Sequence, residues 1–416
     1  MSIGSKSASD SGFTYEETLT WLYDQLPMFQ RDGPAKYRID LSRTHALCDA
    51  LGHPELKFPS IHVAGTNGKG SVCHGVAAAL TAGGLKVGLH TSPHLWDPRE
   101  RIRIDGKMIS RARLINFVAQ HQDLWAELQP SFFELMFGLA MVTFAEEGVD
   151  VAVVETGMGG RLDSTSVVRP LVTSITSIGL DHTQFLGPDL RSIAAEKAGI
   201  LKEGVPCVLG LMPPEARSVI LQHSLRLGVE IYDADREPIR DSEARWLAQG
   251  RGLARKIISM LPTLQFDHEA ASKMLDGLPK DWGLRGRWEW VGEHALVDCA
   301  HNVEGLRATM NKLNDLGRPL RILFASVSDK DLSLVWPLLP LAANYHFCAA
   351  DMPRALDPFD LAALALTKGL KGQAHGNVSE AVDAALKAQT GDELLVVLGS
   401  IFIAGPALEA LGAPME

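Results

Sequence analysis

The stretch that decides the fold is Ser60-Ile-His-Val-Ala-Gly65-Thr-Asn-Gly-Lys69-Gly-Ser71. It opens with a short apolar run that ends in glycine, and residues 71–82, rich in alanine, predict a helix directly after it. A glycine-rich loop between a strand and a helix can hold phosphate oxygens on its backbone N–H groups and on the helix N-terminus. The sequence therefore predicts a phosphate-binding loop at residues 65–71.

We expect a nucleotide to contact every residue of this loop, namely Gly65, Thr66, Asn67, Gly68, Lys69, Gly70 and Ser71. Lys69 would neutralise the β- and γ-phosphates, and Ser71 could approach a bound Mg²⁺. The loop differs from the pattern G-x-x-x-x-G-K-S/T because Gly70 separates Lys69 from Ser71. The simpler interpretation, a glycine-rich turn, leaves the position between strand and helix unexplained.

Strands and helices alternate along the rest of the chain. After the first strand, further strands are expected at residues 86–92, 150–156, 170–179 and 206–210, with helices between them. This order predicts a parallel sheet with helices on both faces. A helix is expected at residues 243–260. The alternation restarts after residues 283–286, with strands at 295–300, 321–327, 345–350 and 394–399 and helices at 303–313 and 379–388. We therefore expect an α/β protein with an N-terminal domain of residues 1–284 and a smaller C-terminal domain of residues 285–416.

One helix start is legible from the sequence. Ser131-Phe-Phe-Glu134 has the S-x-x-E spacing of a capping box and opens an apolar run. Glu134 could also contact a ligand, but the pattern favours the cap.

Composition narrows the possible functions. The chain has 416 residues, of which 46% are hydrophobic and 22% charged, as in ordinary globular proteins. A net charge of -10 argues against a general nucleic-acid binder. Five cysteines without a C-x-x-C pair argue against a disulfide framework or a zinc site and fit the reducing cytoplasm. The sequence contains no apolar run of 18 residues and no signal peptide, so no membrane role is expected, and the first 12 residues predict a loose tail.

Three polar side chains follow predicted strands and are candidate metal ligands. They are Ser92 in Thr91-Ser-Pro-His-Leu95, Glu155 in the run ETGMGGRLD, and His182 in Asp181-His-Thr183. Loops at the carboxyl ends of parallel strands commonly hold ligands. A carboxylate at the end of a buried strand is costly unless it is paired or binds metal, and Mg²⁺ prefers one or two carboxylates. Taken alone, the Ser92 segment would be a simple Ser-Pro turn, and a lone histidine is usually structural.

Four further residues have an ordinary and a functional interpretation. Lys197, in Glu196-Lys-Ala-Gly199, is on its chemistry alone a helix lysine. Near a metal its amine would make sense as a carbamate, which is an anion. In the second half, Arg287 could stabilise charge on transferring phosphate, and Asp298 could accept a hydrogen bond from a ribose hydroxyl. His301 follows in the same run, Asp298-Cys-Ala-His-Asn302, and each of these residues could instead serve packing or capping.

Taken together, these motifs resemble the folylpolyglutamate synthase/dihydrofolate synthase family of the Mur-ligase-like group. The matching runs stand in the family's order: GTNGKGS at 65–71, TSPHL at 91–95, ETGMGGRLDST at 155–165, LDHTQFLG at 180–187, EKAGI at 196–200, GRWE at 286–289 and DCAHN at 298–302. They cover nearly the whole chain, and their combination is far more specific than any one of them.

The resemblance implies a P-loop ATPase domain followed by a Rossmann-like domain, with the site between them. It implies two Mg²⁺ positions served by Ser92, Glu155 and His182, a carbamylated Lys197, and contacts to nucleotide or reacting groups from Arg287, Asp298 and His301. Lys69, Lys197 and His301 would then be the catalytic residues.

The implied reaction uses ATP to convert a substrate carboxylate to an acyl phosphate, which the amine of L-glutamate attacks. The implied acceptors are 7,8-dihydropteroate and reduced folates, with residues 26–31 helping to form the pterin pocket. The enzyme would be a bifunctional cytoplasmic monomer.

Three positions depart from the family pattern. Ser166 stands in place of an asparagine, and Thr156 in place of an aliphatic residue. In the segment Ala248-Gln-Gly-Arg-Gly252, Gly252 occupies the place of an adenine-side asparagine, which leaves the adenine contacts open. Two alternatives therefore stand beside the main interpretation. One is a Mur-type ligase acting on a cell-wall nucleotide-peptide, and the other is a folate- or nucleotide-binding relic without catalysis.

Overall fold

The computed structural model describes residues 13–28, 40–239, 244–261, 263–277 and 283–414. The chain forms two compact units. The first comprises Met1–Ile178, His182–Glu237 and Gln249–Trp282, and the second comprises Gly179–Asp181, Pro238–Ala248 and Gly283–Glu416. The expected tail at residues 1–12 and residues 29–31 of the expected pterin segment lie outside the described residues.

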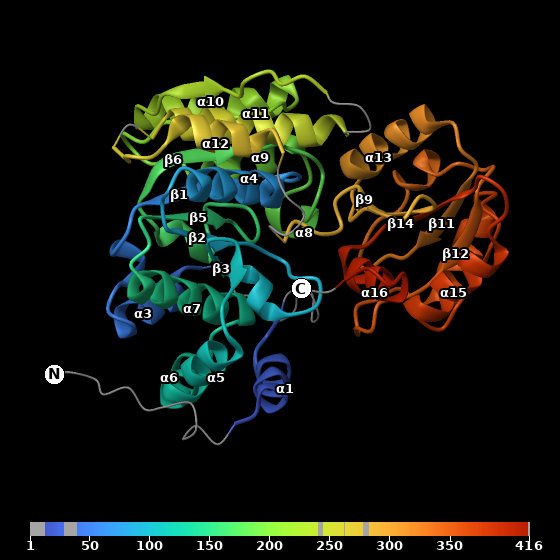
Figure 1. Ribbon diagram of the computed structural model, residues 1–416, viewed down its shortest axis with the longest axis horizontal. Coiled ribbons are helices and arrows are strands. Elements are labelled where there is room, and N and C mark those ends of the chain that lie inside the picture. The colour runs from blue at the N-terminus through green and yellow to red at the C-terminus, as the bar shows by residue number, and fades with distance from the viewer. Residues whose placement is uncertain (1–12, 29–39, 240–243, 262, 278–282, 415–416) are drawn as a thin grey trace. The chain divides into compact units, whose positions relative to one another are not determined.

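The sheet of the first unit has eight strands in the order β4-β3-β2-β5-β1-β6-β7-β8 (Figure 1). Their bounds are β1 Ser60–Ala64, β2 Val87–His90, β3 Ile102–Ile104, β4 Lys107–Met108, β5 Val151–Glu155, β6 Pro170–Ile175, β7 Cys207–Leu209 and β8 Ile231–Asp233. Strands β2, β5, β1, β6, β7 and β8 run parallel, and β3 and β4 are antiparallel. The predicted parallel-rich sheet is confirmed. Strands β3, β4 and β8 were not predicted, because two or three residues carry no readable alternation.

Helices pack on both faces of this sheet. Their bounds are α1 Tyr15–Gln25, α3 Ser42–Ala50, η3 Pro54–Leu56, α4 Lys69–Ala82, η4 Pro98–Arg101, α5 Arg111–Gln120, α6 Gln122–Leu128, α7 Phe132–Glu147, η5 Ser164–Val167, α8 Thr183–Leu186, α9 Leu190–Ala198, α10 Pro214–Leu227, α11 Arg245–Ser259 and α12 His268–Leu275. The first four residues of α11 belong to the second unit. Its position agrees with the helix expected at residues 243–260.

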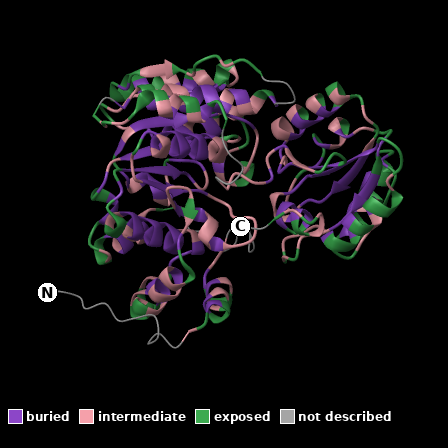
Figure 2. Cartoon of the chain, viewed as in Figure 1, coloured by how far each residue is buried: buried purple, intermediate pink, exposed green. Residues whose placement is uncertain are grey.

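Strand β5 shows how the two faces are filled. Side chains alternate across a strand. Accordingly, Ala152 and Val154 join the core cluster built with α1, α3 and α5–α7, while Val151 and Val153 join the cluster built with α4, α11 and α12. Because both faces are covered, the strands are largely buried (Figure 2), and a few polar side chains such as His62 and Thr173 lie among the apolar ones.

The predicted capping box at α7 is confirmed. Ser131 is the N-cap, its Oγ accepts the Glu134 N–H at 3.2 Å, and Glu134 Oε2 accepts the Ser131 N–H at 2.7 Å. Two backbone donors that a helix start leaves unsatisfied are thereby paired.

The second unit is a smaller sheet of six strands in the order β13-β12-β11-β14-β10-β9. Its strands are β9 Glu289–Val291, β10 Ala295–Val297, β11 Leu320–Phe324, β12 Asn344–Phe347, β13 Gly372–Ala374 and β14 Leu394–Leu398. Its helices are α13 Val303–Leu316, η7 Trp336–Leu338, α14 Pro358–Thr367, α15 Val378–Ala388, η8 Ile401–Ile403 and α16 Ala404–Ala410. Only β9 is antiparallel among these strands, so the expected Rossmann-like arrangement of parallel strands and helices is confirmed.

Within the described residues, no helix is both long and apolar enough to cross a membrane. Each of the five cysteines is a buried free thiol.

Candidate nucleotide and metal site

The glycine-rich loop lies between β1 and α4, as the sequence predicts. Gly65 has φ 154°, and a Cβ at this position would lie only 1.9 Å from Thr176 Oγ1. Gly68 has φ 85° and is the N-cap of α4. Both positions require glycine, one because of a close neighbour and the other because of its left-handed backbone.

Two residues after β6 hold the loop in place, and the sequence did not single them out. Ser177 accepts the Thr66 N–H on its carbonyl oxygen at 2.9 Å and the Asn67 N–H on its Oγ at 3.0 Å. Thr176 Oγ1 donates to the Asn67 carbonyl at 2.6 Å. The loop is therefore held by hydrogen bonds from the segment after β6. The first-turn N–H groups of α4 have no partner within the helix, and such groups bind phosphate oxygens well.

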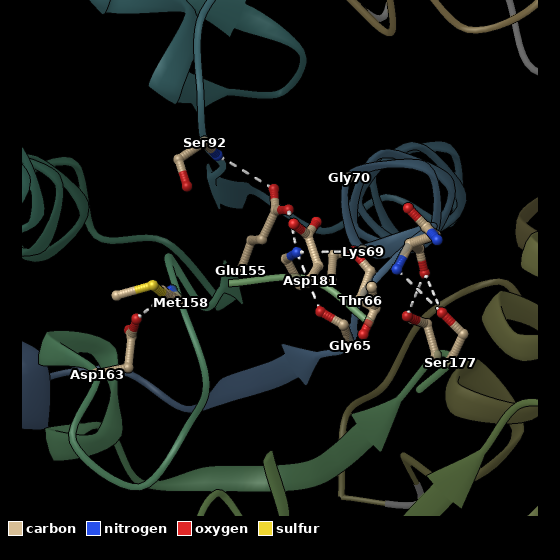
Figure 3. Close-up of polar contacts among 12 residues, drawn as sticks. Gly65, Thr66, Lys69, Gly70, Ser92, Glu155, Met158, Asp163, Ser177 and Asp181 are labelled. Atoms are coloured by element: carbon tan, nitrogen blue, oxygen red, sulfur yellow. Dashed lines mark hydrogen bonds and ion pairs between the residues drawn. The ribbon is translucent and has the colours of Figure 1, made fainter. Parts of the chain in front are cut away.

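Lys69 folds back over this loop (Figure 3). Its Nζ donates to the carbonyl oxygens of Gly65 at 3.1 Å and Thr66 at 3.4 Å, and lies 4.0 Å from Glu155 Oε1. A cation at the mouth of a phosphate loop can neutralise the oxygens that bind there.

Glu155 ends β5 beside β1, with Val63 as its register partner. The residue is only 3% exposed. Its Oε2 accepts the Ser92 N–H at 3.1 Å and would lie 3.6 Å from a Cβ at Gly70 (Figure 3). The carboxylate therefore faces the first turn of α4, and the structure brings Lys69, Ser92 and Glu155 together.

The donors at this point fit Mg²⁺. The buried Glu155 carboxylate is a hard oxygen ligand of the kind Mg²⁺ takes alongside water and phosphate, and its bond to the Ser92 N–H places that serine next to it. His182 is the N-cap of α8, with a left-handed φ of 50°. Among the described residues, no group of three or more His, Cys, Asp and Glu side chains is arranged to hold a metal. His182 as a third ligand remains a prediction.

Lys197 lies in the last turn of α9 and is 4% exposed. Its Nζ donates to the Gly65 carbonyl at 2.9 Å, so both lysines reach the same oxygen. The end of α9 packs closely on the glycine run after β5. A Cβ at Gly199 would lie 2.3 Å from Arg161 Cα, and a Cβ at Gly160 would lie 2.9 Å from the Lys197 carbonyl. The two motifs thus form one packed feature beside the phosphate loop.

The predicted residues of the second unit surround the end of β10. The Asp298 carboxylate accepts the N–H groups of Trp288 at 2.8 Å and Ala300 at 2.9 Å, and the Thr309 hydroxyl at 3.1 Å. Burial raises the pKa of Asp298, and the nearby Arg287 guanidinium works against that rise. Asp298 therefore fixes its own loop in place, and its role toward a ribose stays a prediction.

His301 has partners on both ring nitrogens. Its Nδ1 lies 2.9 Å from the Cys299 carbonyl oxygen, and its Nε2 lies 3.3 Å from Asp181 Oδ2. Lys330, which the sequence did not single out, donates to the His301 carbonyl, and burial lowers the pKa of this lysine. These groups form a polar cluster at the start of α13.

The three departures have local explanations or consequences. The Ser166 hydroxyl donates to the Gly160 carbonyl and so helps to hold the glycine run. A Cβ at Gly252 would lie 2.1 Å from the Asp235 carbonyl oxygen, so a side chain there would force the backbone apart. Thr156 is fully buried, and its Oγ1 has no hydrogen-bond partner among the described residues.

The chain matches the Mur ligase class in both units. Residues 63–210 match the Mur ligase middle domain, and residues 286–401 match the Mur ligase glutamate ligase domain. The phosphate loop and Glu155 thus lie within the matched middle domain, and the second sheet lies within the matched glutamate ligase domain.

Individual relatives identify the family. The chain is 34% identical over 382 residues to the dihydrofolate synthase/folylpolyglutamate synthase of Bacillus subtilis, covering 82% of this chain and 86% of the relative. A folylpolyglutamate synthase of Mycobacterium tuberculosis, solved with ADP and AMPPCP, superposes with a TM-score of 0.84 at 29% identity, covering 97% of this chain and all of the other. A bifunctional folylpolyglutamate synthase/dihydrofolate synthase solved with Mn, AMPPNP and L-glutamate superposes with a TM-score of 0.83 at 27% identity, covering 97% of this chain and 99% of the other. The chain belongs to the folylpolyglutamate synthase/dihydrofolate synthase family.

The unpaired Thr156 hydroxyl generates a stability prediction. Thr156→Val keeps the branched shape and removes a buried polar group, so we expect it to raise the free energy of unfolding by about 1 kcal/mol. Thr173→Val is the matched control, because the Thr173 hydroxyl is buried and donates to the Pro206 carbonyl. Urea denaturation should show the control to be less stable than wild type. A Thr156→Val protein less stable than wild type would mean that this hydroxyl has a partner.

Proposed function

We propose that this protein is an ATP-dependent ligase that joins L-glutamate to the carboxylate of a folate-type acceptor. The observation that carries the proposal is the convergence of Lys69, Ser92 and Glu155 at a phosphate loop whose shape requires its glycines. The nucleotide- and glutamate-bound relatives support the same reaction.

In the proposed reaction an acceptor carboxylate oxygen attacks the γ-phosphorus of ATP, and ADP leaves. The glutamate amine then attacks the acyl carbon, phosphate leaves, and the amine gives up a proton as the amide forms. Lys69 and the first-turn N–H groups of α4 would hold the phosphates and neutralise the charge that develops on them. Ser92 and Glu155, with His182 as the proposed third ligand, would hold Mg²⁺, which supplies additional charge neutralisation when bound.

The roles of the remaining residues belong to the same proposal. Arg287 and Asp298 would contact the nucleotide, and His301 would act on the reacting groups. The functional domains would be residues 1–284 and 285–416. The acceptors would be both 7,8-dihydropteroate and reduced folates, and the protein would act as a cytoplasmic monomer.

Lys197 would work as a carbamate. Its Nζ is buried beside the Gly65 carbonyl and beside a second lysine. Carbamylation turns a cation into an anion, which suits a position near bound metal better than an ammonium does.

Carbamylation can be tested by ¹³C NMR after addition of labelled bicarbonate. We expect a carbamate signal in wild type that is lost in Lys197→Gln. Lys202→Gln is the control, because Lys202 is also partly buried and donates to the Ser166 carbonyl. A signal that survives Lys197→Gln contradicts this role.

The catalytic proposal is tested by ADP release with ATP, Mg²⁺ and L-glutamate, supplying 7,8-dihydropteroate or a tetrahydrofolate in parallel. We expect release with both acceptors and a fall of at least about 100-fold in kcat for Lys69→Ala, because an electrostatic contact to the transferred group is removed. Lys86→Ala is the control, since Lys86 forms an ion pair with Glu147 away from the loop.

Each alternative gives a different result in this assay. Release with one acceptor alone restricts the enzyme to that substrate and contradicts bifunctionality. Turnover of UDP-linked precursors instead would assign a different Mur-type reaction. A folded protein that releases no ADP with any acceptor would make the non-catalytic binding function the correct one.

A further inference from the structure

We infer that a buried hydrogen-bond relay of His62, Thr165 and Asp163 positions the glycine run of residues 157–160 between Glu155 and Lys197. His62 and Thr165 are thus positioning residues for the ligase reaction. The functional part of this inference rests on the proposed function. The structural part rests on contacts within the first unit.

The relay has a defined direction. Thr165 Oγ1 lies 2.5 Å from Asp163 Oδ1 and 2.8 Å from His62 Nε2. A hydroxyl has one hydrogen to donate. When it donates to the Asp163 carboxylate, it accepts from His62, which fixes the histidine as the Nε2–H tautomer. Burial lowers the pKa of His62 to about 3, which agrees with a neutral ring.

Asp163 uses the rest of its carboxylate to hold backbone. Its Oδ2 accepts the Met158 N–H at 2.8 Å (Figure 3). Its Oδ1 accepts the Thr165 N–H at 3.0 Å. Burial raises the pKa of Asp163, and hydrogen bonds from Thr165, Met158 and Gly157 oppose that rise. The Asp163 carboxylate therefore holds the backbone of Gly157 and Met158, which follow Glu155 closely in the chain.

The glycine run has little freedom to settle elsewhere. A Cβ at Gly157 would lie 2.8 Å from the Phe133 ring and 3.2 Å from Asp163 Oδ2. At the other end the Gly160 carbonyl accepts the Ser166 hydroxyl, and Gly160 packs against the Lys197 carbonyl. The run thus spans the distance from Glu155 to Lys197, and Asp163 sets its path.

His62 ties this path to the strand that leads into the phosphate loop. It lies on β1, where His62 pairs in register with Val154 and Val63 pairs with Glu155. Ile61 and Val63 point into the α4 side of the sheet, and His62 points to the opposite side, where Thr165 lies. The relay therefore links the strand before Gly65 to the loop after Glu155 through three side chains, the last of which, Asp163, accepts the Met158 backbone N–H.

The test compares Thr165→Val, which removes the hydroxyl at constant shape, with Thr165→Ser, which retains it. The first measurement is amide hydrogen exchange of residues 156–163, and the second is the Mg²⁺ concentration for half-maximal ADP release. We expect Thr165→Val to speed exchange and to raise that Mg²⁺ concentration, each by about tenfold, because a buried hydrogen-bond relay is cut. Thr165→Ser should stay within about twofold of wild type in both.

Thr143→Val is the matched control, because it removes a buried threonine hydroxyl from α7 that accepts from Arg113 and is outside the relay. It should leave exchange at residues 156–163 and the Mg²⁺ dependence unchanged. If Thr165→Val exchanges and responds to Mg²⁺ like wild type, the inference is overturned. If faster exchange also appears in Thr143→Val, the effect is general destabilisation and the inference is likewise overturned.

Failure of the proposed function would look different. A wild-type protein that releases no ADP contradicts the ligase reaction, while the exchange measurement still decides whether the relay holds the run. If Thr165→Val does not fold, the same measurement can be made on His62→Met and His62→Gln. Of these two variants, only His62→Gln retains a hydrogen-bond donor near Thr165. We then expect faster exchange in His62→Met alone, and equal exchange in the two variants overturns the inference.

Discussion

A buried carboxylate at the carboxyl end of β5 organises the first unit. Taking the Glu155 side chain out of water costs several kcal/mol unless partners offset the loss of hydration. The offset comes from the Ser92 N–H and from Lys69, which lie on segments after β2 and after β1. These segments can meet at Glu155 because β2, β5 and β1 are neighbours and parallel. The order of the strands in the sheet therefore determines which segments surround the Glu155 carboxylate.

The contacts of the Gly65 carbonyl oxygen indicate which charge a ligand of this site should carry. Lys69 and Lys197 both donate to it, so two amino groups share one acceptor. Two ammonium groups at such close range repel each other unless anions lie near them. Glu155 Oε1, 4.0 Å from Lys69 Nζ, offsets part of this repulsion, and phosphate oxygens bound at the loop would offset more of it. The charge pattern of the site thus agrees with the binding of an anionic nucleotide.

Features that depend on neighbouring residues could be predicted from the sequence. Contacts between residues far apart in the chain could not. The strand, loop and helix around Lys69 were readable because apolar runs, glycines and helix formers are contiguous there. The Ser131 cap was readable because its partner is three residues away. By contrast, Ser177 supports the loop from more than a hundred residues away, and His62 reaches Thr165 across a similar separation. A lone serine, threonine or histidine carries no periodicity, so only the fold reveals what it contacts.

We propose that Glu155 holds the metal that accompanies the nucleotide. Calorimetric titration of a non-hydrolysable ATP analogue, with and without Mg²⁺, measures how strongly metal and nucleotide binding are coupled. We expect Mg²⁺ to tighten nucleotide binding to wild type by at least about tenfold, which is 1.4 kcal/mol of coupling. In Glu155→Gln, which retains an acceptor for the Ser92 N–H and loses the charge, most of that coupling should disappear. Equal coupling in the two proteins would contradict the account and place the metal elsewhere.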